Sequence, residues 1–174
     1  KGESNLDYLD LNPLLVQADP GENLRYCKDK IINEVPDTLD EKIWSDIKEK
    51  IEINKKSEFS YNIKNTFRSV GTRLSHHVYK KFLNQKLKPD TISIKLIGSA
   101  GQSLGAFLTT GVKLLVEGDA NDYVGKGLSG GSIIVRPSAE SKLISNENTI
   151  IGNTVLYGAT SGRLFASGQA GERF

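Results

Sequence analysis

Residues 91–136 read TISIKLIGSAGQSLGAFLTTGVKLLVEGDANDYVGKGLSGGSIIVR, and they contain the pattern that determines the fold. In this stretch, short runs rich in β-branched residues alternate with loops rich in glycine. With two later runs, the starts fall at positions 91, 112, 132, 149 and 163, without helical periodicity between them. Antiparallel meanders recur at roughly 8–12 residues, and parallel strands joined by helices need a helical crossover. Recurrence at about 20 residues instead predicts a mainly β fold in which the coils of a parallel β-helix stack. The five runs are Thr91–Ile97, Val112–Glu117, Ser132–Arg136, Thr149–Val155 and Arg163–Ser167.

The loop glycines repeat with a spacing of their own. Gly98-x-x-Gly101-x-x-x-Gly105 is followed by three similar patterns, which begin at Ala120, Val155 and Gly168. Stacked corners need glycine because it allows a positive φ and a close approach of backbones. We therefore expect Gly101 and Gly158 to occupy equivalent corners. The predicted structural glycine motif comprises Gly98, Gly101, Gly105, Gly127, Gly158, Gly162, Gly168 and Gly171.

The composition changes near Asp90. Residues 1–90 hold 31 charged residues and 3 glycines, whereas residues 91–174 hold 13 and 14. Residues 1–35 show no sustained period, which favours an extended connecting segment. Apolar residues spaced by four predict one helix over about residues 38–51 and another over about residues 69–84. The first would begin with a capping-box pattern at Thr38–Glu41. Alternation from Phe59 to Ile63 predicts a strand between them.

These features give a division of the chain in two. We expect residues 1–57 to be a connecting segment with one helix and residues 58–174 to be the glycine-motif domain. Within that domain, residues 58–88 would form a strand and a helix, and residues 91–174 the coils. The chain has no methionine and ends at Phe174 without a terminating element, so we expect an excerpt of a longer polypeptide, truncated at the domain's C-terminal end.

Bulk composition excludes several function classes. The net charge of +2 is too small to indicate binding to nucleic acid or to an anionic membrane surface. No apolar stretch approaches the roughly 20 residues that cross a bilayer. The single cysteine, Cys27, excludes an internal disulfide framework and fits a reducing compartment. We expect neither a membrane nor a nucleic acid as partner.

Three motifs resemble known sites but lack the required context. Gly101–Gly105 matches the G-x-S-x-G elbow around Ser103, yet the elbow needs a helix after the serine and a histidine downstream of it. Gly125–Gly130 matches G-x-G-x-x-G, but a strand run follows instead of a phosphate-binding helix. Asp119, Asn121 and Asp122 do not have the spacing of a calcium loop, so we interpret them as turn-capping residues.

The remaining reactive side chains have no sequence partners. His76 and His77 are consecutive and would point about 100° apart on a helix, so we interpret them as surface residues. Trp44 and Cys27 are interpreted as packing residues. The sequence predicts no catalytic, cofactor-binding or metal-binding residue in this chain.

Several segments resemble one known family. They resemble the C-terminal glycine-motif domain of the large subunit of glutamate synthase, and a shorter match at Ser4–Leu11 is similar to the ferredoxin-dependent type. The matching segments are Ser69–Ser75, Gly98–Ser103, Gly118–Gly131, Ile151–Gly162 and Ala170–Phe174.

The resemblance implies a right-handed β-helix with a scaffolding role. The whole enzyme of this family makes glutamate from glutamine, 2-oxoglutarate and reducing equivalents, with FMN and an iron–sulfur cluster. Its partners would be the amidotransferase and FMN-binding synthase domains of the same polypeptide, and ferredoxin. We expect the fragment alone to bind no FMN and to show no activity.

Two alternatives remain. One is a β-helix enzyme such as a polysaccharide lyase, which needs a ladder of acidic and basic residues that the sequence lacks. The other is a stand-alone scaffold subunit, such as that of formylmethanofuran dehydrogenase. Lysine outnumbers arginine 17 to 6, as AT-rich coding sequence produces. Together with the resemblance to the ferredoxin-dependent type, this bias leads us to expect the plastid stroma of an alga, with a bacterial cytoplasm as the alternative.

Overall fold

The computed structural model describes residues 10–19, 21–23, 26, 32, 37–53, 55–83 and 87–174, so Cys27 and most of Ser4–Leu11 lie outside the described residues. The chain divides into two compact units, residues 1–35 and 36–174. The first contains one helical turn, α1 (Asn12–Leu15), with proline at its start. The predicted extended segment missed this turn, which the fixed φ of Pro13 favours.

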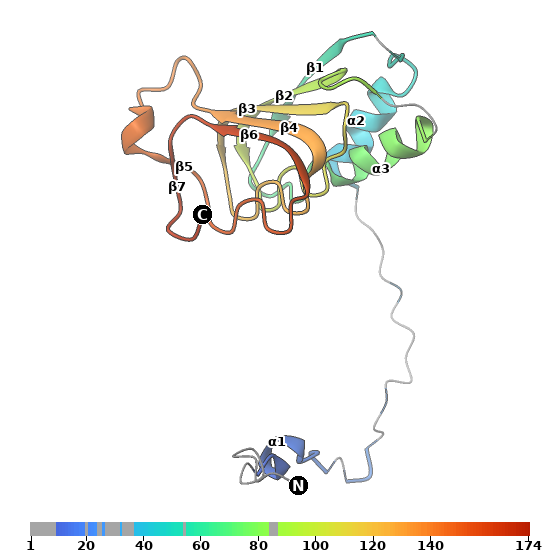
Figure 1. The fold of residues 1–174 in the computed structure, drawn as a ribbon, viewed down its shortest axis with the longest axis vertical. Helices are drawn as coiled ribbons and strands as arrows, with labels where there is room; N and C mark the ends of the chain where they lie inside the picture. The colour runs from blue at the N-terminus through green and yellow to red at the C-terminus, as the bar shows by residue number, and fades with distance from the viewer. Residues whose placement is uncertain are drawn as a thin grey trace, which may run out of the picture. The chain divides into compact units, whose positions relative to one another are not determined.

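Two helices of the second unit match the predicted ones. They are α2 (Leu39–Ile47) and α3 (Thr72–Lys81), which lie together beside the strands in Figure 1. Thr38 caps α2 by accepting a hydrogen bond from the Glu41 amide. The four-residue spacing buries one face of each helix, and Ile43, Ile47 and Leu74 are fully buried. No helix among the described residues is long and apolar enough to cross a membrane.

The strands form a parallel sheet, as Figure 1 shows, which confirms the prediction of a mainly β fold. The order of the main sheet is β1-β2-β3-β4-β6, and β5 and β7 pair in a second, two-stranded sheet. A short 3₁₀ helix, η2 (Ser145–Glu147), precedes β5. The strands are β1 (Ser57–Ile63), β2 (Ile92–Ala100), β3 (Val112–Ala120), β4 (Ser129–Arg136), β5 (Thr149–Ile151), β6 (Ser161–Ala166) and β7 (Gln169–Ala170).

The strand register defines the repeat of the chain. Ile94 pairs with Leu114, and Leu114 pairs with Ile133, so these two coils take up nearly the same length of chain. The next pair, Ile133 with Leu164, spans a much longer stretch, although Thr149 pairs with Gln169 at the usual step. The longer step therefore reflects residues 137–148, which interrupt one coil.

One predicted coil is consequently wrong. The run Thr149–Val155 does not open a coil in the main sheet, because its first three residues form β5 and the rest enter a corner. The Gly152 amide donates to the Asn121 carbonyl oxygen, which places β5 beside the end of β3. β5 thus completes the coil that β4 begins, on the far side of the interrupting residues.

Candidate functional site

The corners between strands share one backbone conformation. In each of three corners, three alternating residues have φ between 53° and 67°, in the left-handed region. Backbone hydrogen bonds join each corner to the next, for example from the Ser103 amide to the Asp122 oxygen and from the Tyr123 amide to the Asn153 oxygen, both 2.9 Å. We call these stacked corners the corner ladder. Its equivalent positions are Ser103, Tyr123 and Thr154; Gly105, Gly125 and Leu156; and Phe107, Gly127 and Gly158.

The corner ladder corrects the expected equivalence of Gly101 and Gly158. Gly158 follows Phe107 and Gly127, because the Phe107 amide donates to Lys126 and the Gly127 amide to Tyr157. A Cβ at Gly158 would meet nothing within 4 Å, whereas one at Gly101 would collide with the carbonyl oxygens of two other residues. The expectation was wrong because hydrogen bonds between coils set the alignment, and they differ from the alignment that the glycine spacing suggested.

The other glycines of the predicted motif also lie in crowded places. A Cβ added at any of them would lie closer than 3.0 Å to another heavy atom, so a side chain requires a local shift. The function of this set in stacking stays a prediction, which variants at Gly101 and Gly158 can test. The crowded positions are Gly98, Gly105, Gly127, Gly162, Gly168 and Gly171.

The structure places the three site-like motifs in the corner ladder. Ser103 lies in a turn rather than before a helix, and no hydrogen bond among the described residues joins it to His76 or His77. The G-x-G-x-x-G stretch leads into β4, as predicted. Asp122 accepts a hydrogen bond from the Asn153 amide at 2.8 Å, which confirms its capping role. Within the described ranges, no group of three or more His, Cys, Asp or Glu side chains could hold a metal ion.

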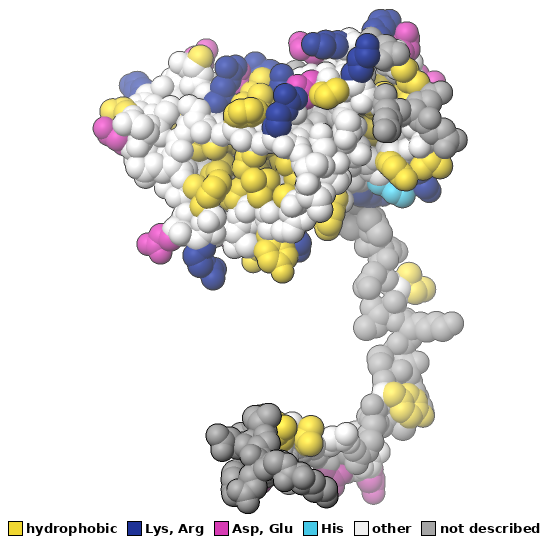
Figure 2. All heavy atoms as spheres, in the orientation of Figure 1, with side chains coloured by type: hydrophobic (Ala, Val, Ile, Leu, Met, Phe, Trp, Pro, Cys, Tyr) yellow, Lys and Arg dark blue, Asp and Glu magenta, His cyan; other side chains and the backbone are white. Residues whose placement is uncertain are grey.

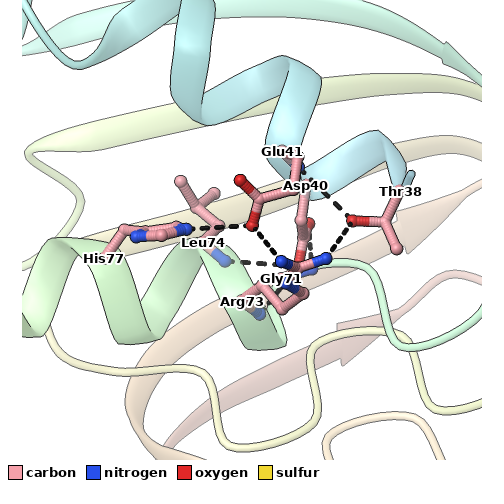
Figure 3. A network of polar contacts seen from close by, with 7 residues as sticks. All are labelled: Thr38, Asp40, Glu41, Gly71, Arg73, Leu74 and His77. Atoms are coloured by element: carbon pink, nitrogen blue, oxygen red, sulfur yellow. Dashed lines mark hydrogen bonds and ion pairs between the residues drawn. The ribbon is translucent and has the colours of Figure 1, made fainter. Parts of the chain in front are cut away.

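A buried carboxylate joins α2 to α3. Asp40 is 2% exposed, and Figure 3 shows it between α2 and the first turn of α3. Its oxygens accept hydrogen bonds from the amides of Gly71 (2.7 Å), Arg73 (2.8 Å) and Leu74 (3.2 Å). Burial raises the pKa of Asp40, although the three amides oppose this shift. Asp40 therefore acts as an N-terminal cap supplied by a different helix.

The neighbouring Glu41, which is more exposed than Asp40, also joins α2 to α3, as Figure 3 shows. Its Oε1 lies 3.0 Å from His77 Nε2 and 2.8 Å from Arg73 Nη2. These two groups lower the pKa of Glu41, with the His77 hydrogen bond as the larger cause. His77 also stacks on Trp44, with ring centroids 5.0 Å apart. His77 is thus only partly at the surface, with 27% of its side chain exposed, whereas His76 is exposed as predicted and Trp44 packs as predicted.

The sheet ends at β6, where one row of inward-facing side chains changes its environment. Ile94, Leu114 and Ile133 occupy this row in β2, β3 and β4 and are 0% exposed. Leu164 occupies the same row in β6 but is only partly buried. Burial in each coil comes from the coils on both sides, so the inner face of β6 lacks one neighbour.

An apolar groove of about 250 Å³ lies at this end of the sheet. Figure 2 shows hydrophobic side chains gathered on the same face of the molecule. We call this groove and the free edge of β6 the open end. Phe174, at its rim, is 67% exposed. Apolar surface beside an unpaired strand edge is a place where another polypeptide segment can pack. The groove is lined by Ile151, Leu164, Ala166, Gly168, Ala170 and Phe174.

Comparison with known proteins agrees with these features. A relative named glutamate synthase [NADPH] large chain, from Azospirillum brasilense, is 61% identical over all of this chain. Ferredoxin-dependent glutamate synthase 2 from Synechocystis sp. is 41% identical over 98% of the chain, and ferredoxin-dependent glutamate synthase from Pyropia yezoensis is 55% identical over 66% of it.

The chain spans only 12%, 11% and 7% of the lengths of these three relatives. The family model described as the GXGXG motif matches residues 40–174, which include most of α2, all of α3, the strands β1 to β7 and the corner ladder. The chain therefore belongs to the GXGXG motif family, as the glycine-motif segment of glutamate synthase large chains.

Proposed function

We propose that this chain is a scaffolding domain of a glutamate synthase, which holds the amidotransferase and FMN-binding synthase domains in place and performs no chemistry itself. The observation that carries this proposal is the share of its relatives that the chain spans: it matches two large chains over 98% or more of its own length but covers only 12% and 11% of theirs. The partly covered apolar row and the strand edge of the open end give the domain a surface on which a further part of that longer polypeptide can pack.

The finer features of the fold are part of the proposal. We propose that the coils wind in a right-handed β-helix, as parallel connections in one sheet prefer. Within the parent polypeptide, we propose that the glycine-motif domain begins with α2, which packs on α3 and lies almost wholly in the matched residues 40–174, and that only the residues before it connect to the preceding domain. The parallel register and the corner ladder support this arrangement.

The whole enzyme would make glutamate from glutamine and 2-oxoglutarate with FMN and an iron–sulfur cluster. The residues of this chain do not fit either cofactor as a site of their own, since the G-x-G-x-x-G stretch leads into β4 and not into a helix that could bind the FMN phosphate. A cysteine-ligated cluster needs several thiolates, and the chain has one cysteine. We therefore assign both cofactors to other domains and derive no step through them here.

The electron donor has two candidates. The match at Ser4–Leu11 favours ferredoxin. The identities favour NADPH, because the chain is 61% identical to a relative named for NADPH but 41% and 55% identical to two relatives named as ferredoxin-dependent. Assaying the full-length enzyme with each donor decides between them. Ferredoxin would fit a plastid stroma, and NADPH would fit a bacterial cytoplasm.

The test of the scaffolding role uses the full-length enzyme. Ala166→Asp places a charge on an exposed side chain at the open end, and Leu164→Asp places one in the partly buried row. We expect both variants to form less glutamate from 2-oxoglutarate per glutamine hydrolysed, because the domains that pass ammonia would separate. Tyr79→Asp, at a 58% exposed position on α3, is the control. An unchanged ratio in a folded Ala166→Asp enzyme would contradict the proposal.

A further inference from the structure

The outer face of the main sheet carries an exposed apolar row. Leu115 on β3 pairs with Ile134 on β4, which pairs with Phe165 on β6, so the three side chains lie side by side across the strands. The neighbouring residues on β3 and β4 point into the core, and these three side chains point outward. Phe165 is 57% exposed, and Leu115 and Ile134 are partly exposed. We call this row the outer ridge.

Cations flank the outer ridge on both sides. Lys113 and Arg163 lie in the outward row before it, Arg136 lies in the outward row after it, and Lys95 on β2 lies in the same row beside Leu115. Figure 2 shows hydrophobic side chains between Lys and Arg side chains over the strands. Contiguous apolar residues with a polar rim are typical of interaction sites rather than of free surface.

The carboxylates on this face leave positive charge in excess. Lys95 and Arg136 share Glu117, at 2.8 and 2.7 Å. The Glu117 side chain is 17% exposed, whereas those of Lys95 and Arg136 are 40% and 53% exposed, so the cations face the solvent. Lys113 has no ion pair among the described residues.

Two further carboxylates bear on this balance. Asp90 pairs with Arg163 at 3.1 Å and removes that charge from the excess. Glu58, on β1, lies in the same row as Lys113 but two strands away, about 10 Å at the usual strand spacing. The excess charge next to the outer ridge is therefore positive, and it comes from Lys113 and from the pair that shares Glu117.

We propose that the outer ridge binds a segment of another domain of the same polypeptide, which places an apolar side chain on the ridge and carboxylates beside Lys113 and Arg136. This inference rests on the proposed function and adds the chemistry of one contact. Charge complementarity selects the occupant, because an acidic segment gains attraction on both sides of the ridge while a basic one is repelled. The aromatic Phe165 provides the anchor that such contacts favour.

The experiment is photo-crosslinking in the full-length enzyme with benzoylphenylalanine at position 165, a conservative replacement for Phe165. We expect an intramolecular crosslink to a segment with Asp or Glu next to the crosslinked residue. The same probe at Ile134 should reach the same segment, and the probe at the Tyr79 position on α3 should not. Lys113→Glu should lower the crosslink yield several-fold, and Lys113→Arg should preserve it.

Other outcomes would overturn the inference. These are no crosslink from either ridge position, a crosslink to a segment without carboxylates, a crosslink between two copies of the polypeptide, or the same product from position 79. A probe at the Phe174 position separates the two proposals. Crosslinks from the open end without crosslinks from the ridge would leave the scaffolding role standing and refute the ridge contact, whereas none from either would refute both.

Discussion

Replacement of Asp40 by alanine should destabilise the domain by breaking the contact between α2 and the start of α3. Asp40 accepts hydrogen bonds from three backbone amides of the segment that starts α3, which belongs to a distant part of the sequence. Asp40→Ala removes both acceptor oxygens, and with them all three hydrogen bonds. The amides of Gly71 and Leu74 belong to buried residues, so water cannot replace the carboxylate there.

The expected loss follows from these contacts. Each buried amide left without a partner costs roughly 1–3 kcal/mol, so the two together cost about 2–6 kcal/mol. Relief from burying a charge offsets part of this cost. We therefore expect a loss of about 3 kcal/mol in the free energy of unfolding, or roughly 10 °C in Tm for a unit of this size. Asp40→Asn keeps one acceptor oxygen and should lose about half as much.

The assay is urea denaturation followed by the fluorescence of Trp44, the only tryptophan in the chain. Trp44 stacks on His77 of α3 and therefore reports on the contact between the two helices. Asp37→Ala, an exposed carboxylate one residue before the cap of α2, is the matched control and should change stability by less than about 0.5 kcal/mol. A loss below about 1 kcal/mol in Asp40→Ala, or equal losses in both variants, would refute this explanation of the buried carboxylate.

Three other predictions test the corners and the charges. Gly101→Ala should lower the free energy of unfolding by about 2–3 kcal/mol, because the added Cβ meets two backbone oxygens. Gly158→Ala should lower it by only about 1 kcal/mol, because the left-handed φ is its one source of strain. Urea midpoints in the reverse order would contradict the corner ladder. The stabilising effect of Glu41 should be complete above its unfolded pKa of 4.5 and should disappear as pH falls through its lowered folded pKa. The difference in urea midpoint between the wild type and Glu41→Gln should therefore shrink from about pH 6 to about pH 3. A constant difference would disprove this linkage. Glu117→Gln should lower the Tm only slightly, and by less at high salt, because its partners are solvent-exposed. A large loss of Tm that does not depend on salt would show that the pairs are structural.

The sequence allowed the strands and helices of the second unit to be predicted because their periodicity is local. Apolar residues four apart located α2 and α3, and β-branched runs located β2, β3 and β4. The regular recurrence of those runs indicated parallel stacking. It failed at Thr149, because residues 137–148 interrupt a coil and make its second part look like the start of a new one.

Other features could not be predicted because they depend on register or on distant contacts. Glycines mark crowded positions, but the corner alignment depends on hydrogen bonds between coils, which make Gly152 rather than Gly158 the equivalent of Gly101. The capping-box pattern located the start of α2, and in a complete capping box the Glu41 carboxylate would also accept a hydrogen bond from the Thr38 amide. That carboxylate instead contacts Arg73 and His77 on α3, which only the packing of the two helices brings near.

Hydrogen exchange of the full-length enzyme measures whether another part of the polypeptide covers β6 (Ser161–Ala166). In a parallel sheet, alternate amides of this strand point toward β4 and toward the free edge. If the domain is a scaffold packed at its open end, we expect both sets of amides to exchange slowly. A crosslink from the probe at position 174 to the amidotransferase or synthase domain, and not to a following coil of the same domain, identifies what covers the edge. Exchange of the edge-facing amides at the rate of an unstructured peptide would contradict the scaffolding role.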